Sequence, residues 1–117
     1  MRFLTTACIC LILFCEISCS GTEKKSWKIN SFDQKRTISI NSPEGKTVNN
    51  ANVYIKGKFS GKIKIQKQEG YPIAEFTEDS IPERLFYDFY GGEFQINLLE
   101  SNARGNIELT IEIPYSY

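Results

Sequence analysis

A strict two-residue alternation runs through the middle of the chain. From Val53 to Ile65 every odd position holds an apolar residue or glycine, while lysines, Tyr54 and Ser60 occupy the even positions. Successive side chains of a β-strand point to opposite faces of a sheet. A period of two over this length therefore predicts extended chain with one buried face and one lysine-bearing face.

Two geometries fit this alternation. A hairpin that turns at Ser60-Gly61-Lys62 would pair Phe59 with Ile63, so that apolar residues face each other across the strands. The alternative is one long strand that bends at Gly57 and Gly61.

Further alternating segments predict more strands, separated by turns such as Ser42-Pro43-Glu44-Gly45. The segments cover residues 27–29, 36–40, 73–77, 94–98 and 107–113, and the last two are expected to form a hairpin. The sequence thus predicts an all-β fold, an antiparallel β-sandwich of about six to eight short strands. A small β-barrel is the alternative.

The N-terminus has the layout of a secretory signal: Arg2, an apolar run over residues 3–15, and small residues near residue 19. All four cysteines lie in this segment, at positions 8, 10, 15 and 19, which argues against a disulfide framework in the rest of the chain. Ile17-Ser18-Cys19 resembles the lipobox of bacterial lipoproteins, although Glu16 stands where that box usually has an apolar residue. The resemblance implies that Cys19 carries a diacylglyceryl group. Ordinary cleavage after Ser20 and an uncleaved anchor are the alternatives.

These observations divide the chain into three parts. We expect a signal peptide over residues 1–18, a lipid-anchored tether over residues 19–26, and a single β-sandwich domain over residues 27–117. The expected location is the cell envelope, with the protein held on a membrane by its N-terminal lipid. A secreted or periplasmic protein is the alternative.

Charge is balanced overall but unevenly distributed. Fourteen basic and fourteen acidic residues give a net charge of zero, which argues against a nucleic-acid partner. Six lysines and no acid lie between residues 46 and 67, whereas residues 69–93 hold seven acids and only Arg84. We expect the two stretches to be neighbouring strands whose exposed faces pair by charge.

Residues that carry chemistry are scarce. The chain has no histidine, and none of the motifs for a nucleophile, a phosphate loop or a metal site occurs in it. The sequence therefore predicts a non-enzymatic protein with no catalytic residue, no cofactor and no metal site.

The aromatic segment Leu85-Phe86-Tyr87-Asp88-Phe89-Tyr90 is the one candidate for a binding surface. Tyr87, Phe89 and Tyr90 would form that surface if they project from a loop or an open face, where flat rings suit contacts with proteins or sugars. The competing interpretation is that the segment is a central strand whose aromatics serve packing.

The order of these features resembles small lipoproteins of Bacteroidetes-like bacteria. The residues that carry the resemblance are Ile55-Lys-Gly57-Lys-Phe59-Ser-Gly61, Tyr87-Asp88-Phe89-Tyr90 and Gly105-Asn-Ile107-Glu-Leu109-Thr-Ile111. The resemblance implies an envelope location and an all-β fold, and it assigns no functional residue.

We therefore predict an envelope lipoprotein domain that binds a protein partner or serves as an accessory component of an envelope complex. A carbohydrate-binding surface lipoprotein, with a polysaccharide ligand, is the alternative. A purely structural envelope protein is the second alternative.

Replacing the thiol tests the predicted anchor. Cys19→Ala removes the only atom that can take the lipid, so the protein should move from the membrane fraction to the soluble fraction. Fractionation with immunodetection measures this, with Cys15→Ala as the matched control. A Cys19→Ala protein that stays with the membrane would contradict lipid attachment at this residue.

Overall fold

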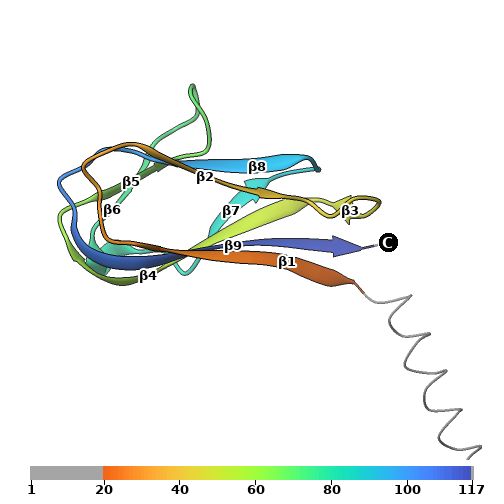
Figure 1. The fold of residues 1–117 in the computed structure, drawn as a ribbon, viewed down its shortest axis with the longest axis horizontal. Helices are drawn as coiled ribbons and strands as arrows, with labels where there is room; N and C mark the ends of the chain where they lie inside the picture. Colours follow the sequence, from red (N-terminus) through yellow and green to blue (C-terminus); the bar gives the residue numbers. More distant parts are fainter. Residues whose placement is uncertain (1–19, 117) are drawn as a thin grey trace, which may run out of the picture.

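The computed structural model describes residues 20–116, which form two antiparallel sheets stacked face to face (Figure 1). The strands are β1 (Gly21–Ile29), β2 (Arg36–Asn41), β3 (Thr47–Val48), β4 (Asn50–Ser60), β5 (Ile63–Gln66), β6 (Ala74–Phe76), β7 (Leu85–Asp88), β8 (Glu93–Leu98) and β9 (Arg104–Ser116), with the single 3₁₀ turn η1 (Glu78–Ser80). Among these residues no helix is long and apolar enough to cross a membrane. The predicted signal peptide and Cys19 lie outside the described residues.

Strand order identifies the topology. One sheet has the order β1-β9-β4-β7, with β3 pairing on β9, and the other has the order β2-β8-β5-β6. In the described chain β5 and β6 are the only consecutive strands that pair, because most connections cross between the sheets. This is the order of a jelly roll, so the predicted antiparallel sandwich is confirmed and the barrel is not. The count is nine rather than six to eight, and β9 is thirteen residues long.

Neither geometry considered for residues 53–65 is formed, since β4 and β5 are separate strands and do not pair, and the predicted hairpin of residues 94–98 with 107–113 is wrong as well. β4 and β5 belong to different sheets, so Phe59 does not pair with Ile63, and β8 and β9 are likewise separated. The short link at Gly61 carries the chain from one sheet to the sheet that faces it. Odd-numbered side chains point into the core before and after this crossing, and the alternation therefore looks the same as in a hairpin.

The predicted tether over residues 19–26 is corrected as well. Strand β1 begins at Gly21, six residues before Trp27, and pairs with β9 along its whole length, from Gly21 opposite Tyr115 to Ile29 opposite Ile107. The segment is polar because β1 is an end strand of its sheet, where most of its side chains are exposed. Charged side chains on an edge strand also discourage unwanted pairing with other chains.

The core lies between the two sheets and consists of aliphatic side chains together with five phenylalanines. Two central strands supply six of its most buried side chains: Phe94, Ile96 and Leu98 of β8, and Leu109, Ile111 and Ile113 of β9. Sequence alternation identified each of these residues as inward-facing. Burial of an aliphatic or aromatic side chain contributes about 1.5–3 kcal/mol, so this layer is the main source of stability.

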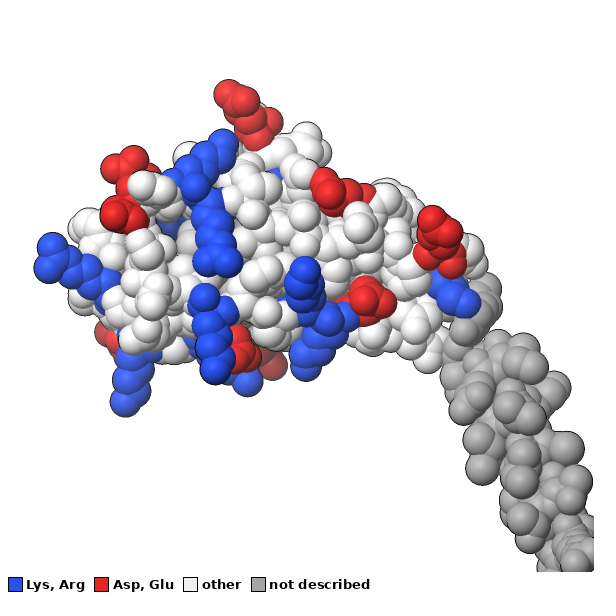
Figure 2. All heavy atoms as spheres, viewed as in Figure 1, with Lys and Arg blue, Asp and Glu red and all other residues white. Residues whose placement is uncertain are grey.

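Charged side chains of both signs are interspersed over the face shown in Figure 2. The expected pairing of the lysine and acid stretches holds in part: Lys62 and Lys64 each lie 3.9 Å from a carboxylate oxygen of Glu75. Lys56, however, lies opposite Glu108 on β9 rather than opposite the acid stretch. All of these groups are substantially exposed, so the pairs contribute little to stability.

Two glycines let β4 and β9 approach each other closely. Gly57 (φ +142°) and Gly105 (φ +141°) adopt a backbone conformation that L side chains rarely take. A Cβ at Gly57 would overlap the carbonyl oxygen of Asn106, and a Cβ at Gly105 would overlap that of Lys58. Backbone cannot swing aside as a side chain can, so these positions require glycine.

Gly57→Ala should therefore destabilise the domain by about 3 kcal/mol, from backbone strain together with steric overlap. Gly45→Ala is the matched control, because Gly45 also has positive φ (+72°) but nothing lies within 4 Å of an added Cβ. The control should cost about 1 kcal/mol. Denaturant unfolding of residues 20–117 measures both, and equal losses would show that the close approach does not matter.

Candidate functional site

The aromatic segment forms an end strand, not the central strand that the packing interpretation expected. β7 pairs with β4 on one side, from Leu85 opposite Val53 to Asp88 opposite Asn50, and is the last strand of its sheet. Phe86 lies on the outer face and is 57% exposed, whereas Leu85 and Tyr87 pack partly against the core.

Phe89 belongs to the core rather than to the predicted binding surface. Its side chain is only 8% exposed, and its ring meets that of Phe94 edge-on at a centroid distance of 5.3 Å. The alternation of β7 ends at Asp88, and the backbone N–H of Phe89 donates to the carbonyl oxygen of Asn49. This anchors the residue at the point where the chain leaves the sheet.

Tyr87 and Tyr90 have different environments. The Tyr87 ring is half-buried, 5.8 Å from the Phe94 ring, and this burial raises the pKa of its phenol above the ordinary value. Tyr90 is 76% exposed, the most exposed of the large apolar or aromatic side chains over residues 20–116. It lies in the turn that leads through Gly91 and Gly92 into β8.

A groove of about 460 Å³ runs between β7 and the loop that precedes β6. β7 and β6 are the end strands of the two sheets, so the groove lies along one open side of the sandwich. It is lined by Lys67, Tyr71, Pro72, Ile73, Ala74, Phe86, Tyr87 and Asp88. We name it the edge groove.

Exposed apolar side chains concentrate in the edge groove. Tyr71 (45%), Ile73 (51%) and Phe86 are exposed and line it. Of the predicted site residues only Tyr87 lies there. The sequence missed Tyr71 because Gly70-Tyr71-Pro72 predicts a chain break, and it missed Ile73 because alternation assigned that residue to a strand. Aromatic and apolar composition within the loop was the only available signal.

Polar contacts hold the walls of the edge groove in place. The Nζ atom of Lys67 donates to the carbonyl oxygen of Asp88 at 3.1 Å and lies 5.1 Å from the centroid of the Tyr71 ring. The side-chain amide of Gln66 donates to the carbonyl oxygen of Tyr71 at 2.8 Å. Lys67 thus connects the two walls, one from each sheet.

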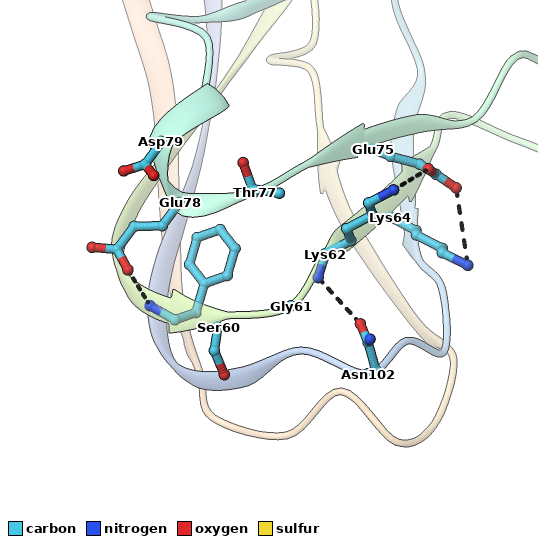
Figure 3. A pocket seen from close by; sticks show the side chains of 10 residues that line it. Ser60, Gly61, Lys62, Lys64, Glu75, Thr77, Glu78, Asp79 and Asn102 are labelled. Carbon is cyan, nitrogen blue, oxygen red and sulfur yellow. Dashed lines mark hydrogen bonds and ion pairs between the residues drawn. The ribbon is translucent and has the colours of Figure 1, made fainter.

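A larger, polar hollow of about 890 Å³ lies at one end of the sandwich, around the β4–β5 link (Figure 3). Three of its charged side chains form ion pairs with one another. Glu75 lies between Lys62 and Lys64, and the backbone N–H groups of Lys62 and Phe59 donate to Asn102 Oδ1 (3.2 Å) and Glu78 Oε2 (3.3 Å).

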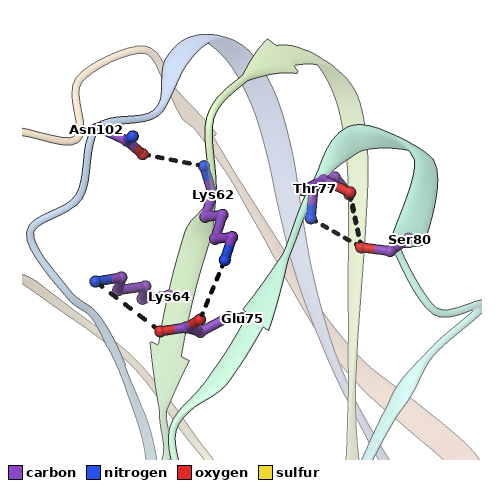
Figure 4. Close-up of polar contacts among 6 residues, drawn as sticks. All are labelled: Lys62, Lys64, Glu75, Thr77, Ser80 and Asn102. Atoms are coloured by element: carbon purple, nitrogen blue, oxygen red, sulfur yellow. Dashed lines mark hydrogen bonds and ion pairs between the residues drawn. The ribbon is translucent and has the colours of Figure 1, made fainter.

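The remaining contacts in the hollow are structural. Ser80 Oγ accepts from the backbone N–H of Thr77 at 2.8 Å and closes the η1 turn (Figure 4). Over residues 20–116 no group of three or more histidine, cysteine, aspartate or glutamate side chains is placed to hold a metal ion. The polar hollow thus holds charged and polar side chains, several of which contact one another, and the edge groove offers exposed apolar surface.

Comparison with known proteins bears on the fold. No protein-family model matches the chain, and no curated protein matches it. Among solved structures, a subunit of Bacillus endospore appendages, described as disulfide-linked pili, is 12% identical with a TM-score of 0.54, covering 85% of this chain and 89% of that chain. A periplasmic inhibitor of g-type lysozyme from Aeromonas hydrophila is 12% identical with a TM-score of 0.42, covering 84% and 89%. At such low identity the first likeness shows the fold alone, and the second carries no further weight.

Burial of Tyr87 predicts a pH dependence. Because its pKa is raised in the folded state, the unfolded chain loses this proton first as the pH rises past about 10. Below that pH the protein has the full stability that the neutral phenol contributes. As the pH rises from the unfolded pKa to the folded pKa, the free energy of unfolding falls by no more than about 1.4 kcal/mol per pH unit. Tyr87→Phe should flatten the decline of unfolding free energy above pH 10, and Tyr90→Phe, at an exposed hydroxyl, should not. Identical slopes in wild type and Tyr87→Phe would contradict the prediction.

Proposed function

We propose that this chain is a non-enzymatic binding domain, exported and held on a membrane through acylated Cys19, that binds a protein partner through the edge groove. One observation carries the proposal. Tyr71, Ile73 and Phe86 are exposed although the core lies nearby, and all three line the same groove. Exposed apolar side chains that gather around one hollow are typical of contact sites.

The composition of the edge groove supports a protein partner. Six of its eight lining residues are apolar or aromatic, and the amine of Lys67 is already engaged by the carbonyl of Asp88 and the ring of Tyr71. Aromatic side chains supply contact area at low cost in side-chain entropy, and they dominate the binding energy of many interfaces.

Neighbouring contacts favour a preformed site. Lys67 joins the two walls, and the Arg84 guanidinium lies 6.0 Å from the centre of the Phe86 ring. A groove whose walls are already connected loses less conformational entropy on binding than a mobile loop would.

Carbohydrate is the second candidate ligand. Tyr71 and Phe86 offer exposed rings, and Asp88 lines the same groove with a carboxylate able to accept hydrogen bonds from sugar hydroxyls. Ring stacking together with one polar acceptor is enough for weak sugar binding. A purely structural role has less support, because the exposed Phe86 contributes little to packing.

A double variant, Ile73→Ala/Phe86→Ala, tests the edge groove. Removing two apolar side chains at the centre of a contact should weaken binding by about 10- to 100-fold. The mature lipidated protein is immobilised, and the envelope proteins that it retains are identified by mass spectrometry. The affinity of the purified partner is then measured by calorimetry.

Tyr90→Ala is the matched control, because it removes an exposed aromatic ring outside the edge groove. Loss of one envelope protein in the double variant and its retention in the control would support the proposal. A polysaccharide panel runs in parallel. If a glycan binds instead of a protein, and the double variant loses that binding, the ligand of the edge groove is a carbohydrate. If all variants retain the ligand equally, the edge groove is not the binding site.

A further inference from the structure

The structure leaves almost no spacer between Cys19 and the folded domain. β1 begins at Gly21, so only Ser20 separates the cysteine from the first residue of the sheet. Two residues of extended chain span at most about 7 Å. An acyl group on Cys19 would therefore hold the start of β1 close to the lipid headgroups.

Several other segments lie at the same end of the sandwich as the start of β1. Gly21 pairs with Tyr115 near the end of β9, and Val48 of β3 pairs with Tyr115 as well. Figure 1 shows the start of β1, the strand β3 and the end of β9 together at one end. Side chains exposed at this end are therefore the ones nearest to the point of attachment.

Tyr90 is exposed at this end. The loop that follows β2 and the loop that carries Tyr90 are joined by two hydrogen bonds, from Ser42 N–H to the Gly92 carbonyl oxygen (2.8 Å) and from Gly92 N–H to Ser42 Oγ (2.9 Å). β7 ends at Asp88, opposite the first residue of β4, and after the buried Phe89 the exposed Tyr90 follows at this end. Tyrosine is favoured at membrane interfaces, where its ring is shielded and its hydroxyl stays hydrated.

We infer that the domain stands on the bilayer on this end, with Tyr90 in the headgroup region as a second contact beside the lipid. The inference rests on the proposed acylation of Cys19. Acidic and basic side chains both occur at this end, Glu44 and Glu93 beside Lys46. The contact should therefore persist at high salt and should not require anionic lipid.

Site-specific fluorescence tests this orientation. The chain after Cys19 has no cysteine, so an introduced cysteine is the only free thiol of the lipidated mature protein. Glu44→Cys and Gln34→Cys place an NBD label at opposite ends of β2, which separates them by six strand residues, about 20 Å. Each protein is reconstituted in phosphatidylethanolamine–phosphatidylglycerol vesicles that contain lipids spin-labelled near the headgroup.

We expect the label at residue 44 to be quenched at least twofold more than the label at residue 34. Adding Tyr90→Ser should reduce quenching at residue 44 while the protein still floats with the vesicles, because the lipid remains. Circular dichroism checks that each variant is folded. Equal quenching at the two positions, with flotation intact, would overturn the orientation and leave the anchor standing. Quenching unchanged by Tyr90→Ser would remove Tyr90 from the contact. Loss of flotation in the parent protein would overturn both the anchor and the orientation.

Discussion

Strand β9 is the constraint on which the rest of the fold depends. It pairs with β1 on one side and with β4 and β3 on the other, and its inward side chains are among the most buried of the described residues. Its outer face places Glu108 between Lys28 and Lys56, so opposite charges flank the strand from both neighbours. The close contact at Gly57 and Gly105 fixes the β4–β9 pair, and β4 in turn holds β7 and therefore one wall of the edge groove.

Much of the inward and outward pattern could be predicted from the sequence, while most of the strand pairing could not. Ile63 was expected to face the core and does, since alternation reports which side of a strand is buried. Its partner across the sheet is Phe76, not Phe59. A hairpin and a crossing between facing sheets give the same alternation, so only long-range contacts distinguish them. The start of β1 escaped prediction for another reason: an edge strand exposed to water needs no apolar pattern.

The candidate site shows a similar limit. The aromatic segment was recognised by composition, but which rings are exposed depends on where β7 ends and on which loop packs beside it. Phe89 turns into the core one residue after the strand ends, and Tyr71 and Ile73 complete the edge groove from the other sheet. Phe86, Asn52, Glu112 and Lys24 form one row across the sheet, three residues beyond Gly21. If the domain stands on the end that carries Tyr90, this row lies about 20 Å or less from the headgroups, and a partner in the edge groove would be met at the membrane surface.

The pairing of β1 with β9 has a consequence for how the protein matures. The first strand of the described chain pairs only with the last, at residues 78 to 94 positions further along, and only β5 and β6 form a local hairpin. Such a high contact order predicts slow folding, because the chain loses the entropy of closing long loops before the contacts of the sheet can stabilise it. Because synthesis proceeds from the N-terminus, the edge of β1 that pairs with β9 stays unpaired until β9 has been made. Assembly of this sheet should therefore be completed in one late step, after β9 has been made.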